Sequence, residues 1–270
     1  MLSRQAAEPG RPLIVCIPGS GYDERYFDIP GWSFLTMLGD RGTGAVAITR
    51  PGYPADEHSA RHRPSFAQSA ELLDTVVADI WSRVGDVIDG VVLLGHSVGG
   101  AVALNLAARQ PLWPLLGVAV SGVGDRPANA AVRHFAGIPA HQPIAMTFDS
   151  VRPMFYGPVG TFDESLVPAF ADSLVVMPAG DPVEVNTAWP ADLPGVAASV
   201  GVPVFHAFAE FERLWQTGDE RMAAFAAMFT NAPFVESYVI AACGHNIEHH
   251  HAATGYADLV SAFATRCRRP

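Results

Sequence analysis

Two hydrophobic patterns alternate along the chain. Short apolar runs bounded by Gly and Pro are typical of buried parallel strands, and apolar residues at every third or fourth position indicate helices packed by one face. Strands are expected at residues 13–17, 45–49, 91–94, 116–120, 202–208 and 234–240. Helices are expected near 31–38, over 65–84 with Ser65 as the N-cap, after Ser97, around 220–229 and from about 253 to 267. The alternation predicts an α/β protein with a parallel sheet flanked by helices.

The alternation stops between residues 125 and 200. This stretch is rich in Pro and Gly and carries many large apolar residues, among them Phe155 and Trp189. It is too long for a plain connection and too apolar for a disordered linker. We therefore expect a helical cap (lid) at residues 125–200, inserted into a core formed by residues 1–124 and 201–270.

The composition narrows the possible functions. The 270 residues carry a formal net charge of −10, which argues against nucleic acid and anionic membranes as partners. All 17 basic residues are arginine, and the absence of lysine excludes Schiff-base chemistry and a Walker-type lysine. The three cysteines form no metal-type pair, no apolar run reaches ~18 residues, and residues 1–12 lack the apolar core of a signal peptide. We expect a soluble, cytoplasmic protein that acts on a small molecule and uses neither metal nor cofactor.

Residues 91–100, VVLLGHSVGG, carry the strongest chemical signal. An apolar run ends in Gly95-His96-Ser97-Val98-Gly99 and passes into a helix-forming segment, which predicts a strand, a sharp turn and a helix with the serine at the apex. The glycines allow strand and helix to pack closely, and free N–H groups at the start of the helix favour negative charge there. Ser97 is therefore the candidate nucleophile.

A serine hydroxyl needs a base, usually a histidine that a carboxylate orients. His245 is the candidate base, because it follows a predicted strand at the edge where parallel sheets place their active sites. Three carboxylates are candidates for the acid. Glu210 and Glu212 follow the strand at 202–208, and Asp125 follows the strand before it. Glu210 and Glu212 share one strand-like parity, so spacing alone does not separate these two.

The oxyanion that forms in acyl transfer needs two or more fixed N–H donors. The backbone N–H of Val98, directly after the nucleophile, is one candidate. The other is that of Ser20, in the glycine-rich loop after the first predicted strand.

Two features near the candidate base have simpler interpretations than catalysis. His249-His250-His251 follow Glu248, but this order is not the zinc-protease motif, and we expect a solvated helix start. Cys243 lies on the strand side of the loop without glycines that shape a turn, and we expect a buried bystander.

The chain order of Ser97, an acid and His245, with G-x-S-x-G after a strand, resembles the α/β-hydrolase superfamily over roughly residues 13–267. Residues 18–21 look like the family's oxyanion loop. Arg50-Pro51-Gly52-Tyr53 looks like its D-x-x-G segment, with arginine where aspartate is usual.

The resemblance also bears on the acid and on the sheet. In the segment 203–215, Glu212 falls where the family's triad aspartate sits, while Asp125 remains a rival. Residues 1–12 are too few for the N-terminal hairpin of many members. The resemblance therefore implies an α/β-hydrolase fold with a mostly parallel sheet of six or seven strands.

The leading hypothesis is a serine hydrolase that cleaves an ester or thioester of a small, mostly apolar compound. An alternative from another class is C–C bond hydrolysis, lyase or cyclase chemistry on the same fold. A third is a binding protein that has lost activity, against which the intact Ser97 and His245 count. Relatives that use an aspartate nucleophile, such as epoxide hydrolases, are disfavoured by the serine.

Overall fold

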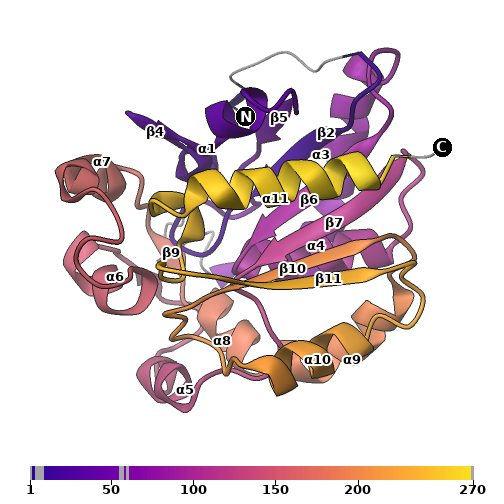
Figure 1. Ribbon diagram of the computed structural model, residues 1–270. Coiled ribbons are helices and arrows are strands. Elements are labelled where there is room, and N and C mark those ends of the chain that lie inside the picture. Colours follow the sequence, from indigo (N-terminus) through magenta and orange to yellow (C-terminus); the bar gives the residue numbers. More distant parts are fainter. Residues whose placement is uncertain (1, 4–8, 55–57, 59–60, 269–270) are drawn as a thin grey trace.

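A computed structural model describes residues 2–3, 9–54, 58 and 61–268. Its centre is a seven-stranded sheet in the order β1-β5-β2-β6-β7-β10-β11, of which only β1 runs antiparallel (Figure 1). The strands are β1 (Leu2–Ser3), β5 (Ala45–Ala47), β2 (Leu13–Ile17), β6 (Val91–His96), β7 (Leu115–Ser121), β10 (Val204–Ala209) and β11 (Val235–Ile240). The six parallel strands lie within two residues of the positions that the sequence predicts, which confirms the predicted fold class.

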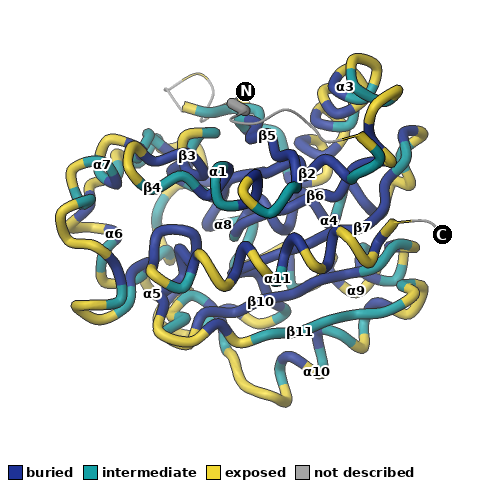
Figure 2. The backbone as a smooth tube through the Cα atoms, turned by 45° about the horizontal axis from the view of Figure 1, so that its top comes forward, coloured by how far each residue is buried: buried dark blue, intermediate teal, exposed yellow. Residues whose placement is uncertain are grey.

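Helices cover both faces of the sheet. One face packs against α3 (Phe66–Val84), α4 (Val98–Ala108), α9 (Ala188–Ser199) and α10 (Asp219–Ala227), and the other against α1 (Phe34–Gly39) and α11 (Ala253–Arg266). Alternate residues of β2 serve the two cores: Val15 and Ile17 face the first, and Ile14 and Cys16 the second. The central strands are buried throughout, and the exposed positions lie mainly on the outer sides of the helices and on loops (Figure 2).

The helix α3 shows why the sequence pattern predicts these elements well. Ser65 is its N-cap and forms a capping box with Gln68, each side chain bonding the other residue's backbone N–H. Its buried positions, which include Leu73, Val77 and Ile80, recur every three or four residues.

The expected cap region, residues 125–200, holds five helices and one small two-stranded sheet. They are α5 (Asn129–Phe135), α6 (Phe148–Phe155), α7 (Val167–Asp172), α8 (Gly180–Asn186) and α9, with β8 (Pro143–Ile144) paired to β9 (Met177–Pro178) and the 3-10 turn η2 (Glu164–Leu166). The last helix packs beside α4, and its Trp189 and Leu193 belong to the first core. We propose that the cap extends from α5 to α8 and that α9 belongs to the core layer.

Four further short elements lie outside the main sheet and the cap region. They are the 3-10 turns η1 (Glu24–Phe27) and η3 (Ile247–His249) and the hairpin of β3 (Asp28–Ile29) with β4 (Trp32–Ser33). Among the described residues, every helix is too short or too polar to span a membrane.

Candidate active site

Ser97 occupies a strained turn between β6 and α4. Its φ of 53° and ψ of −125° lie outside the regions that residues other than glycine favour. A Cβ on Gly95 would come within 2.4 Å of the Gly99 carbonyl oxygen, and one on Gly99 within 2.2 Å of that of Ile17. The Ser97 N–H donates to the Ser121 carbonyl at 2.7 Å. The motif therefore forms the predicted strand, sharp turn and helix, with glycines required by the close backbone contacts.

His245 follows β11 and contacts one of the three candidate acids. Its Nδ1 lies 2.8 Å from Oε2 of Glu212, and both side chains are almost completely buried. The other carboxylate oxygen, Oε1, accepts from the N–H groups of Arg213 and Leu214. Because a carboxylate accepts, Nδ1 carries the hydrogen and Nε2 is left as the basic nitrogen. Among the described residues this buried Nε2 has no hydrogen-bond partner.

The two rival carboxylates are engaged elsewhere. Asp125 accepts from Arg221 at 3.1 Å, and Glu210 accepts from the N–H of Ala242 at 2.8 Å. Of the three candidates, the geometry brings only Glu212 to His245.

The loop after β2 lies directly against Ser97. A Cβ on Gly19 would be 2.9 Å from the Cβ of Ser97, so the backbone at Gly19 and Ser20 passes beside the serine. Val98 is the first residue of α4, where N–H groups have no partner within the helix. The hydroxyl of Ser20 donates to Asp181 at 2.9 Å, which leaves the backbone N–H of Ser20 as its possible oxyanion donor.

Ser97 and His245 line one cavity, whose empty space is about 430 Å³ when the part open to solvent is included. Its polar floor comes from the core and also includes Tyr22 and Asn246, whose side chains are joined by a hydrogen bond of 2.8 Å. Its apolar walls come mostly from the cap; they are Phe135, Phe155, Met177, Pro182, Val185 and the core residue Leu214. No Arg, Asp or Glu side chain of the described residues lines the cavity.

Comparison with known proteins identifies the family. Residues 14–259 match the family model described as the alpha/beta hydrolase family. The chain belongs to this family. Three solved structures illustrate the fold. An esterase from Thermogutta terrifontis is 14% identical with a TM-score of 0.64, and the match covers 97% of this chain and 92% of the esterase. An enol-lactonase from Burkholderia xenovorans is 17% identical with a TM-score of 0.63 (95% of this chain, 92% of the lactonase), and a soluble variant of monoglyceride lipase from Saccharomyces cerevisiae is 12% identical with a TM-score of 0.70 (97% of this chain, 88% of the lipase).

A curated relative matches a shorter part of this α/β-hydrolase. The 30 kDa subunit of magnesium chelatase from Rhodobacter capsulatus is 27% identical over 130 residues, which cover 47% of this chain and 37% of that protein. The match thus spans little more than a third of the relative's length.

The histidine-rich segment of this α/β-hydrolase differs from its expected form. Glu248, His249 and His250 are buried, so the expectation of a solvated helix start is wrong for them. The ring of His249 stacks on Phe170 with centroids 4.8 Å apart, and Nε2 of His250 accepts from the N–H groups of Gly157 and Gly244. Burial lowers the pKa of His249 to about 3 and that of His250 to about 4, so both rings are neutral near pH 7.

Cys243 is buried, as expected, and its thiol donates to the Ile240 carbonyl at 3.1 Å. Burial raises the pKa of this thiol to about 12, which keeps it protonated near neutral pH. The side chain therefore has the chemistry of a packing residue.

The sequence analysis misses several polar residues around the site. Tyr22 and Asn246 line the cavity, and Asp181 receives the Ser20 hydroxyl from the cap side. Tyr22 directly follows the loop at residues 18–21 and Asn246 directly follows His245, but neither side chain is part of the pattern that singles out those segments, and Asp181 lies in the cap. The one available signal is Arg50, an arginine at a position where the family usually has aspartate.

Proposed function

We propose that this α/β-hydrolase is a serine hydrolase that cleaves an ester or thioester of a small, mostly apolar compound. The observation that carries the proposal is the pairing of His245 with Glu212 beside a cavity that Ser97 also lines. A nucleophile, a base and a group that orients the base are the parts that acyl transfer through an acyl-enzyme requires.

Each step follows from the position of these groups. Glu212 holds Nδ1–H of His245, so the free Nε2 takes the proton of the Ser97 hydroxyl while its oxygen attacks the substrate carbonyl. The N–H groups of Val98 and Ser20 stabilise the oxyanion of the tetrahedral intermediate. The protonated histidine then gives its proton to the leaving alcohol or thiol. Water, activated by the same histidine, releases the acid and restores the serine.

The cavity favours an uncharged, apolar substrate. Its cap walls are apolar, and no charged Arg, Asp or Glu side chain of the described residues is present to neutralise a substrate charge. Phe135 also borders two further pockets, one of which it shares with Pro182 and the other with Val185 and Ser97. We therefore propose that a substrate chain extends from Ser97 along the side of α5 and α8. The comparison structures that are an esterase and a monoglyceride lipase accord with ester chemistry.

The test combines a covalent probe with simple esters. The wild-type protein is incubated with a fluorophosphonate probe and, separately, with p-nitrophenyl acetate and butyrate. Ser97→Ala removes the nucleophile, and Ser82→Ala removes an exposed serine hydroxyl on α3 as a matched control. We expect labelling and turnover in the wild type and in Ser82→Ala, and neither in Ser97→Ala.

Other outcomes discriminate between the hypotheses. A folded wild type that is neither labelled nor active contradicts a serine hydrolase. Labelling at Ser97 without ester turnover favours C–C bond hydrolysis, lyase or cyclase chemistry. Membranes and nucleic acid are not part of the proposed function, and a small molecule in the cytoplasm is its proposed substrate.

A further inference from the structure

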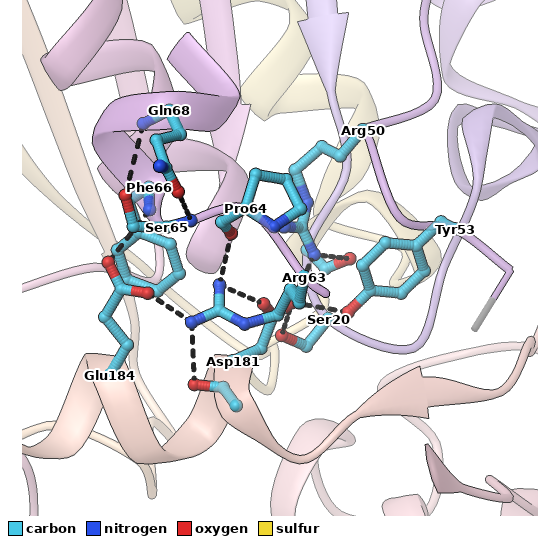
Figure 3. A network of polar contacts seen from close by, with 12 residues as sticks. Ser20, Arg50, Tyr53, Arg63, Pro64, Ser65, Phe66, Gln68, Asp181 and Glu184 are labelled. Atoms are coloured by element: carbon cyan, nitrogen blue, oxygen red, sulfur yellow. Dashed lines mark hydrogen bonds and ion pairs between the residues drawn. The ribbon is translucent and has the colours of Figure 1, made fainter. Parts of the chain in front are cut away.

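A buried carboxylate of the cap gathers polar side chains from the core. Asp181, in the first turn of α8, is fully buried, and its Oδ2 accepts from Ser20 Oγ at 2.9 Å, Arg50 Nη2 at 2.7 Å and Tyr53 Oη at 2.5 Å (Figure 3). Its Oδ1 accepts from Arg63 Nη1 at 3.0 Å. Segments of the chain more than 100 residues apart therefore meet on one carboxylate.

Arg50 connects this carboxylate to the backbone of the oxyanion loop. Its guanidinium is 1% exposed; Nε donates to the Pro18 carbonyl at 2.9 Å and Nη2 to the Gly19 carbonyl at 3.3 Å. The Gly19 carbonyl and the Ser20 N–H belong to one trans peptide, in which the two groups point in opposite directions. Fixing the carbonyl on the arginine therefore directs the Ser20 N–H away from Arg50.

The same carboxylate fixes α8, which carries part of the cavity wall. Glu184, one turn after Asp181, accepts from Arg63 and from the N–H of Phe66 at 2.8 Å (Figure 3). Pro182 and Val185, on the same helix, line the cavity beside Ser97. The oxyanion loop and the cap wall are thus anchored to one group of charges.

Stability alone does not account for this arrangement. A fully buried ion pair loses the hydration of both ions, and apolar residues of similar size are often at least as stabilising. Burial by itself raises the pKa of Asp181, but the charges of Arg50 and Arg63 outweigh this effect and hold it below its ordinary value. The carboxylate therefore stays ionised, and the planar fork of the arginine fixes directions that a single ammonium does not.

We propose that Arg50 and Asp181 are positioning residues, which together orient the Ser20 N–H of the oxyanion hole and hold the α8 wall against it. The inference rests on the proposed function. It also gives a role to the arginine that stands where the family usually has aspartate.

The test compares two arginines that bond the same carboxylate. Both Arg50→Met and Arg63→Met remove a bond to Asp181. Only Arg50→Met also removes the bonds to the Pro18 and Gly19 carbonyls. Loss of an oxyanion donor lowers kcat by about 10²–10³-fold, and misorientation costs less, so we expect Arg50→Met to lower kcat about 10–100-fold. Arg63→Met is expected to loosen α8, whose Pro182 and Val185 line the cavity, and so to raise KM while kcat is retained.

A second readout separates oxyanion stabilisation from general disturbance. A butyl trifluoromethyl ketone forms a tetrahedral adduct with Ser97 whose oxygen occupies the oxyanion hole, and the corresponding trifluoromethyl carbinol binds without forming one. We expect Arg50→Met to raise Ki for the ketone about 10–100-fold and to leave Ki for the carbinol unchanged. In Arg63→Met the two constants are expected to change together.

The variants also keep the inference falsifiable if one of them fails to fold. Should Arg50→Met lack a native near-UV spectrum, Arg50→Lys carries the test, because it retains the charge and loses the forked contacts. One outcome overturns this inference alone. In it the wild type is active, but neither Arg50 variant changes the ratio of the ketone Ki to the carbinol Ki more than Arg63→Met changes it. A wild type that is neither labelled nor active overturns the proposed function and this inference with it.

Discussion

Replacing Glu248 by glutamine is expected to change how the stability of the protein depends on pH. This carboxyl is 1% exposed, accepts from Tyr26 Oη at 2.6 Å and from Ser121 Oγ at 3.4 Å, and lies 3.7 Å from Nδ1 of His96. Burial raises its pKa to about 7, against the opposing effects of the Tyr26 hydrogen bond and the nearby His245. Burial also lowers the pKa of His96 well below its ordinary value, so that ring supplies no charge at neutral pH.

The size of the effect follows from the shift in pKa. The ordinary value of 4.5 rises to about 7, and at about 1.4 kcal/mol per unit this corresponds to ~3 kcal/mol. Between these two values the folded protein holds a proton that the unfolded chain has released. The free energy of unfolding therefore falls as pH rises from 4.5 to 7, and above pH 7 the whole ~3 kcal/mol is lost. Cys16 and Tyr256 also interact with Glu248. The pKa values of both are raised, so both groups stay neutral in this pH range.

Glutamine at position 248 has nearly the same shape and never carries the charge. We therefore expect Glu248→Gln to be more stable than the wild type by less than ~1 kcal/mol near pH 5 and by up to ~3 kcal/mol near pH 8. The measurement is denaturation by urea at pH 5, 6, 7 and 8, followed by both circular dichroism and tryptophan fluorescence. Glu71→Gln, which removes an exposed carboxylate on α3, is the matched control and should follow the wild type.

The outcome that refutes the reasoning is a constant difference. If the stabilities of Glu248→Gln and the wild type stay parallel from pH 5 to pH 8, the carboxyl has the same pKa in the folded and unfolded states. Burial would then not control its charge.

Three further changes test the site. Glu212→Gln should lower kcat about 10²–10⁴-fold, because glutamine no longer holds the tautomer of His245 that carries its hydrogen on Nδ1. Asp125→Asn should keep kcat within about threefold of the wild type. Equal losses of kcat in steady-state assays would contradict the assignment of Glu212. Gly122→Ala should lower both kcat and Tm, because its Cβ would come within 2.7 Å of Cε1 of His245 at a φ of +60°; unchanged kinetics would show that the ring does not need this space. Phe135→Ala should shift the preference among p-nitrophenyl esters from acetate and butyrate towards octanoate by about tenfold in kcat/KM, because this ring borders all three cavities. An unchanged preference would show that the acyl chain lies elsewhere.

Much of the fold follows from local sequence. The runs that form β2, β6 and β7 are almost entirely apolar, with His96 and Ser121 as polar residues at the ends of β6 and β7, since both faces of these strands are buried. The resulting alternation with helices decides the fold class, because parallel strands need helical crossovers. The turn around Ser97 is predictable for the same reason, since its glycines and its serine are adjacent in the chain.

The partners of Ser97 depend on distant contacts and are harder to predict. Glu210 and Glu212 lie two residues apart on one loop, and Glu212 differs from Glu210 in its contact with His245, 33 residues further along the chain. The spacing of the two carboxylates does not encode that difference, and only the resemblance of segment 203–215 to the family favours Glu212. The burial of His249 is equally hard to predict, because the rings that cover it come from distant parts of the chain: Tyr156 and Phe170 from the cap and Tyr26 from the core.

Two buried carboxyls flank the site, and their opposite behaviour shows what decides the charge of each. Asp181 faces Arg50 and Arg63, which outweigh the effect of burial and lower its pKa. Glu248 is buried as deeply, but its side chain accepts hydrogen bonds from hydroxyls and the adjacent His96 ring is neutral, so burial outweighs the opposing effect of His245 and its pKa rises to about 7. A change from pH 8 to pH 5 therefore neutralises the carboxyl on the base side and leaves the one beside the oxyanion loop ionised. Any effect of pH in this range that Glu248→Gln abolishes accordingly arises on the side of His245.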